Sequence, residues 1–89
     1  MEIEYTVQFQ QEGLKFVAHA MPLDVMSSGP CPERARQALE EAVHLFLATA
    51  QDAGTCEDIL LEEGYVRKEN KWVTRPLIAV ETHSTAVTA

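Results

Sequence analysis

The 89-residue sequence lacks a long apolar run, and none of its hydrophobic stretches approaches the ~20 residues that a transmembrane helix requires. The first nine residues, MEIEYTVQF, are acidic and alternate in polarity. They lack the basic start and the apolar stretch of a secretory signal. These two absences predict a cytoplasmic protein that does not contact a membrane.

Cysteine is also scarce. Cys31 and Cys56 are too few for a disulfide framework, and in a cytoplasmic chain both are expected to remain reduced. The three histidines, His19, His44 and His83, are not spaced from one another or from a cysteine as metal ligands are. We therefore expect no metal and no cofactor.

Basic residues are half as frequent as acidic ones, at 7 against 14, which gives a net charge of −7. Twelve of the acids and only three of the bases lie in residues 1–64, so this part carries −9, whereas residues 65–89 carry +2. An acidic body is repelled by nucleic acid and by anionic membranes, and it suits a basic protein partner. Net charge also keeps a small domain in solution, so charge alone leaves both interpretations open.

Four segments have the pattern of β-strands. Residues 2–11 alternate between apolar and polar over four cycles, and Glu12-Gly13 then marks a turn into a second strand over Leu14–Met21. Val25–Ser28 is a short third strand, and Trp72–Glu81 is the last one. In the second strand we expect the side chains at alternate positions to face the core. These are Leu14, Phe16, Ala18 and Ala20.

Two helices are expected between the third and the last strand. The longer one starts at Pro32, a favoured first helical residue, and ends at Gly54, whereas Cys31 is a poor N-cap. Its apolar residues recur at three- and four-residue steps, at Ala35, Leu39, Ala42, Val43, Phe46 and Ala50. The shorter helix runs from Cys56 to Glu63 and buries Ile59 and Leu60, and Thr55 with Asp58 resembles a capping box.

The order of these elements predicts an α+β fold. We expect an antiparallel sheet of three to four strands, packed on one long helix and one short helix in the order β-β-β-α-α-β. A single domain covers residues 1–82, and residues 83–89 form a flexible tail.

No group of residues in the sequence indicates an enzyme. Cys31 and His19 are a conceivable nucleophile and base, but no local signature supports the pair. Glu40 and Glu41 are adjacent on a helix and point to different sides, as solvated carboxylates do. The stretch YVRKENKWVTR, residues 65–75, mixes four bases with two aromatics and is the only one with nucleic-acid character; a solvated turn before a strand is the alternative interpretation.

The order of the motifs resembles that of the HicB-like antitoxin family over about residues 4–64. The resemblance is carried by a strand that ends in proline, a following glycine and an acidic helix. The matching positions are Phe16, Val17, Ala18, Pro22, Gly29, Ala35, Leu39, Glu41 and Ala42. Two features depart from the family pattern: Cys31 replaces the usual Thr or Ser cap, and residues 65–89 are too few for the C-terminal DNA-binding module of many members.

The resemblance implies a partial ribonuclease H-like fold without catalytic acids, and a homo-oligomer of at least two copies. It implies that the chain neutralises a HicA-like toxin, a small basic RNA-cleaving protein, by covering the toxin's RNA-facing surface. Direct DNA binding is not expected. The candidate partner-binding residues are the acids Asp24, Glu33, Glu40 and Glu41. The alternative is a solitary oligomeric domain of the same fold with no toxin partner.

Overall fold

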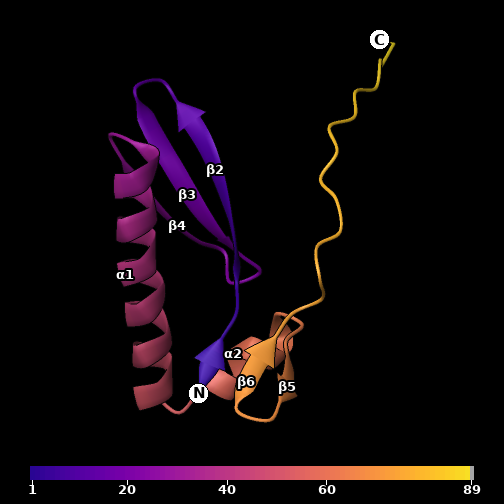
Figure 1. Ribbon diagram of the computed structural model, residues 1–89. Helices are drawn as coiled ribbons and strands as arrows, with labels where there is room; N and C mark the ends of the chain where they lie inside the picture. Colours follow the sequence, from indigo (N-terminus) through magenta and orange to yellow (C-terminus); the bar gives the residue numbers. More distant parts are fainter. Residues whose placement is uncertain (89) are drawn as a thin grey trace.

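The computed structural model describes residues 1–88, and it confirms the α+β class with two helices and two small sheets (Figure 1). The first sheet has the order β2-β3-β4, and the second has the order β1-β6-β5. The elements are β1 (Glu2–Ile3), β2 (Thr6–Glu12), β3 (Lys15–Met21), β4 (Val25–Gly29), α1 (Pro32–Asp52), α2 (Cys56–Glu62), β5 (Val66–Lys68) and β6 (Lys71–Val73).

The predicted hairpin is present as β2 and β3, which pair antiparallel. Glu12 pairs with Lys15, so Gly13 and Leu14 form a two-residue turn. Gly13 has φ +62°, as the first central residue of a type II′ turn requires. The predicted core position of Leu14 is therefore wrong: the turn places its side chain in solvent, where it is 93% exposed.

β3 is the central strand of the first sheet, and β4 pairs antiparallel with its other edge. Ala18 and Ala20 are fully buried, as predicted, because they lie on the side of β3 that α1 covers. Their small side chains let the helix approach the sheet closely. β2 has no second neighbour in this sheet, so its outer edge is open.

α1 spans 21 residues, and both of its ends agree with the sequence prediction. Pro32 is the first helical residue, and Cys31 makes no side-chain cap hydrogen bond. At the other end Gly54, with φ +76°, donates to the Gln51 carbonyl, and the next amide donates to that of Ala50. This is a Schellman motif, which satisfies the last carbonyls of the helix.

α2 is present, but the predicted capping box is not. Thr55 has helical φ and ψ instead of the extended conformation of an N-cap, and its hydroxyl donates to the Ala50 carbonyl at 3.3 Å. The reason is that Thr55 also belongs to the Schellman motif that ends α1. Leu60 is fully buried as predicted, Ile59 is half-buried, and Phe46 on α1 is 36% exposed instead of lying in the core.

The single sheet expected from the sequence is wrong, because the final strand pairs elsewhere. β6 ends at Val73, far short of Glu81, and forms a hairpin with β5. It also pairs in parallel with β1, where Ile3 lies opposite Trp72. The predicted first strand is consequently split, and the chain crosses from one sheet to the other at Glu4 and Tyr5.

The core joins both sheets to the two helices. Leu39 and Leu60 are its largest fully buried side chains, and it also contains Trp72 from β6 and Tyr65, which lies between α2 and β5. The rest of the core is Ala18, Ala20, Leu23, Ala35, Val43, Ala50 and Cys56. Within residues 1–88, no helix combines the length and the apolar character needed to cross a membrane.

Candidate partner-binding surface

Three of the four candidate acids lie on α1. Glu33 is in its first turn, where a carboxylate interacts favourably with the helix dipole, and Glu40 lies two turns later on the same side. Glu41 is adjacent, and all three side chains are exposed. The apolar periodicity of α1 explains this placement, because it turns Leu39 and Val43 into the core and leaves the acids outside.

Asp24 lies apart from these three acids. It occupies the turn between β3 and β4 with φ +61°, a conformation that Asp tolerates better than most residues, and its amide donates to the Ala20 carbonyl at 2.8 Å. Its carboxylate lies 2.6 Å from Nε2 of His19. Since His19 alternates with the buried Ala18 and Ala20, it projects from the side of the sheet opposite α1. The structure therefore separates Asp24 from the acidic side of α1.

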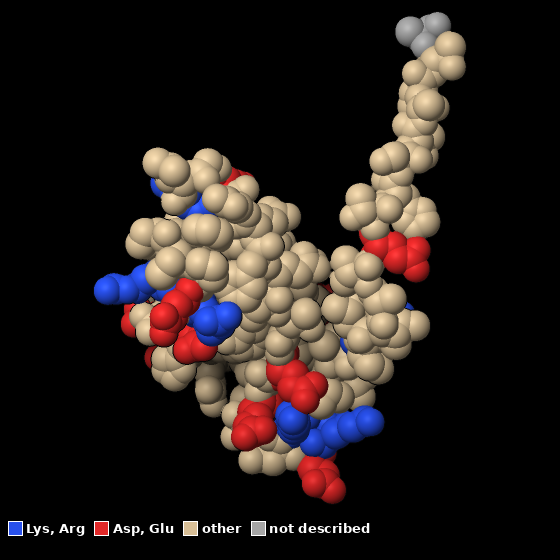
Figure 2. Space-filling model, turned by 45° about the horizontal axis from the view of Figure 1, so that its top comes forward, with Lys and Arg blue, Asp and Glu red and all other residues tan. Residues whose placement is uncertain are grey.

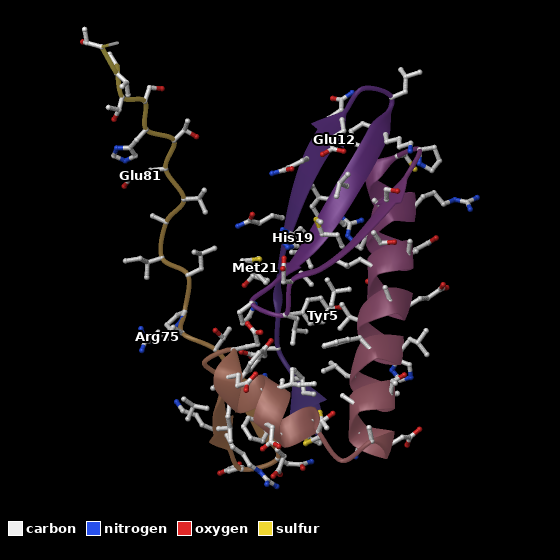
Figure 3. All side chains as sticks on the ribbon, turned by 180° about the vertical axis from the view of Figure 1, so that it is seen from behind. Tyr5, Glu12, His19, Met21, Arg75 and Glu81 are labelled. Carbon is white, nitrogen blue, oxygen red and sulfur yellow. The ribbon has the colours of Figure 1, made fainter. Side chains whose placement is uncertain are left out.

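A groove of about 400 Å³ runs between α1 and the N-terminal segment. Ile3 and Tyr5 form one wall, and Glu40 and His44 are part of the other. Figure 3 shows Tyr5 on the side of the chain that faces α1. Partial burial raises the pKa of Tyr5, and the negative charge of Glu40 raises it further. A neutral phenol and a carboxylate therefore line a groove together with apolar side chains such as Val43 and Leu47.

Neither cysteine is placed as an activated nucleophile. Cys56 is buried, and burial, followed by the charge of Glu57, raises the pKa of its thiol, which disfavours the reactive thiolate. Cys31 and His19, the pair considered from the sequence, are not joined by a hydrogen bond; His19 contacts Asp24 instead. Throughout residues 1–88 there is no group of three or more His, Cys, Asp or Glu side chains that could hold a metal ion.

The basic stretch 65–75 does not present its aromatics to solvent. Tyr65 and Trp72 are 2% and 3% exposed, so neither ring is free to stack on a nucleic-acid base. Arg67 lies over the Trp72 ring, with its guanidinium carbon 5.9 Å from the ring centroid. Lys71 binds Glu4 at 2.8 Å. The aromatic and basic residues of this segment therefore have structural contacts within and next to the second sheet.

One surface was not recognised from the sequence. The side of the first sheet opposite α1 carries Val17, Met21 and Met26, and Figure 3 shows Met21 beside His19 on this side. Met26 is 61% exposed. The alternation of β3 places Val17 and Met21 on this side, but it does not show that no helix covers them.

Comparison of the chain with protein-family models, with curated proteins and with solved structures gives no match.

Proposed function

We propose that this chain is a HicB-like antitoxin, which binds a small basic RNA-cleaving toxin and covers the RNA-facing surface of that toxin. The observation that carries the proposal is the concentration of acid on the helices. Residues 31–64 contain eight acids and two bases, and all ten side chains are exposed. Four of these acids, Glu33, Glu40, Glu41 and Asp52, lie on α1 together with both bases, Arg34 and Arg36. We propose that Glu33, Glu40 and Glu41 contact the toxin, whereas the remaining acids contribute to the net charge.

The proposed mechanism is electrostatic competition. A protein that cleaves RNA holds the phosphate backbone with basic side chains. An acidic protein surface attracts these basic side chains and raises the association rate. Once the antitoxin is bound, RNA no longer reaches them. The acids of α1 suit this role because a helix holds them in a fixed spacing.

The proposal extends to the fold. The hairpin β2-β3, followed by β4 and by a long helix on one side of the sheet, supports a likeness to a partial ribonuclease H-like fold. The separate sheet β1-β6-β5 is an addition to that plan.

A solitary oligomeric domain without a toxin is the alternative function. The specific observation in its favour is the apolar groove between α1 and α2, which is lined by Leu45, Phe46 and Ile59 among others. Leu45 is 67% exposed. Self-association would cover these side chains whether or not a toxin exists.

The test uses any small basic protein that a reading frame adjacent to that of this chain encodes, purified by itself and assayed for RNA cleavage. We expect the chain to inhibit cleavage, and we expect inhibition to weaken as salt is added. The double variant Glu40→Gln/Glu41→Gln should weaken binding about tenfold. Glu62→Gln/Glu63→Gln is the matched control, because it removes the same charge at the end of α2, outside the proposed contact with α1.

Each outcome has a distinct meaning. If the unmodified chain binds no such protein and inhibits no cleavage, the antitoxin function is wrong and the solitary domain is favoured. If both double variants weaken inhibition equally, the toxin responds to net charge and the assignment to α1 is wrong. Circular dichroism of the variants should be unchanged, since all four side chains are exposed.

A further inference from the structure

The C-terminal arm, residues 74–88, leaves the second sheet without forming regular structure. Figure 1 shows it extending away from β6 on the side of the molecule opposite α1. Figure 2 shows that it projects from the body of the molecule and that no other segment covers it in this view. Its apolar part is Leu77, Ile78 and Val80, which are 59%, 94% and 74% exposed. A run of large apolar side chains in solvent is unfavourable unless something covers it.

The first sheet offers a complementary surface. The outer edge of β2 is unpaired over seven residues, and such an edge is a template for another strand. Phe9 lies near this edge on the side that faces α1 and is 39% exposed, although the guanidinium of Arg36 covers part of its ring at 5.0 Å. On the opposite side, Met21 is 37% exposed. An apolar strand laid along β2 would therefore cover apolar side chains on both sides of the sheet.

The arm and the sheet border a common cavity of about 350 Å³. Thr6, Gln8 and Met21 line it from the sheet, and residues 74–77 line it from the arm. Pro76 has a fixed φ, and Arg75 before it is restricted to extended conformations. These two residues restrict a sharp bend at the start of the arm, and the arm runs past its own sheet without pairing with β2 (Figure 1).

The accessible surface is large enough for a stable dimer. A compact monomer of this mass exposes about 5,200 Å², whereas this chain exposes 6938 Å². The surplus, about 1,700 Å², is roughly twice the ~800 Å² that each partner buries in a typical stable complex. Within residues 1–88, β2 is the longest of the four edge strands β1, β2, β4 and β5, and the arm of a second copy is a strand that can pair with its open edge.

We propose that two copies of the chain exchange their arms, and that residues 77–80 of each copy pair with the outer edge of β2 in the other. Backbone hydrogen bonds along β2 hold the arm, and alternate side chains cover the two sides of the sheet. The exchange is reciprocal, so the interface closes with twofold symmetry. It uses a different surface from the acidic side of α1, and it does not depend on the toxin.

The first experiment measures the mass of the full chain by light scattering over a range of concentrations. We expect a dimer, and we expect Ile78→Pro to weaken it about 100-fold, because proline removes a backbone donor from the middle of the added strand. Val87→Pro is the matched control: Val87 is 89% exposed and lies beyond the pairing segment. A chain that is monomeric at every concentration, or a dimer that Ile78→Pro leaves unchanged, would overturn the proposal.

The second experiment asks whether the arm reaches its own sheet or that of the partner. Two chains with different tags, both carrying Cys31→Ser, receive Gln8→Cys and Val80→Cys respectively, and the mixture is treated with a flexible bis-maleimide. A cross-link that joins the two tags is the expected result. A third chain with Cys31→Ser carries both Gln8→Cys and Val80→Cys. If this chain cross-links internally and the two tagged chains do not cross-link to each other, the arm folds back on its own sheet and the exchange is wrong.

Discussion

The phenolic hydroxyl of Tyr65 donates a hydrogen bond to the backbone carbonyl of Glu4, across 61 residues of sequence. Tyr65 directly follows the turn that ends α2, and Glu4 lies where the chain crosses from β1 to β2. The bond therefore joins the segment between α2 and β5 to the segment between β1 and β2. The ring of Tyr65 is 2% exposed, so water does not replace this bond easily.

Tyr65→Phe should lower the free energy of unfolding by about 1–2 kcal/mol, because it leaves the Glu4 carbonyl without this donor. The measurement is urea unfolding followed by tryptophan fluorescence, since Trp72 belongs to the same core. Tyr5→Phe is the control, because within residues 1–88 the side chain of Tyr5 makes no hydrogen bond. An equal loss in both variants would contradict the role of the bond.

Tyr65 also predicts a loss of stability in alkali. Burial raises its pKa to about 12, and the charges of Glu63 and Glu4 and the nearby Tyr5 raise it too, from the ordinary value of 10.0. Because the neutral phenol is favoured in the folded state, its contribution is fully present below about pH 10 and is lost as the pH rises toward 12. A pKa difference of this size corresponds to about 3 kcal/mol.

The check is urea unfolding at a series of pH values between about 9 and 12. The unmodified chain should lose stability across this range, and Tyr65→Phe should lose less, because it has no phenol at this position. Part of the slope should remain in the variant, since the pKa of Tyr5 is raised as well. Identical slopes would show that Tyr65 titrates normally.

The local elements were predictable because their signals lie within a few residues of one another. The turn at Gly13, the start of α1 at Pro32 and its end at Gly54 each follow from one residue type and its neighbours. Phe46 follows the apolar periodicity of α1 but is 36% exposed, because periodicity does not show where the sheet stops covering the helix.

The pairing of the second sheet was not predictable from periodicity. β1 and β6 pair over two residues each, although almost the whole chain separates them. So short a contact has no pattern of its own. Residues 77–80 have the composition of a strand, but a strand forms only with a partner, and one chain does not provide it. Of the candidate site, the exposed acids of α1 were predictable, whereas the separation of Asp24 from them required the course of the sheet.

Gly29→Ala should destabilise the junction of β4 and α1. A methyl group at this position would lie 2.7 Å from the backbone nitrogen of Ala35 and 2.9 Å from the carbonyl carbon of Arg34. Because both atoms belong to the helix backbone, the helix itself must shift, at a cost of about 1–3 kcal/mol. Ser28→Ala, one residue earlier, adds no volume and is the control in thermal unfolding. If the two variants melt together, the close approach of α1 to β4 is wrong.

Two leucines on α1 provide a paired test of burial. Leu39 is fully buried, whereas Leu45 is 67% exposed on the same helix. Leu39→Ala should cost about 2–5 kcal/mol through lost burial and a cavity, and Leu45→Ala should stay within about 0.5 kcal/mol. Urea unfolding at low protein concentration measures both.

If Leu45→Ala costs as much as Leu39→Ala, its side chain is covered in solution, and the surface between α1 and α2 that includes Phe46 and Ile59 takes part in self-association as well. In that case the loss should grow with protein concentration, because a contact between copies stabilises the folded state by mass action, whereas a contact within one chain does not depend on concentration.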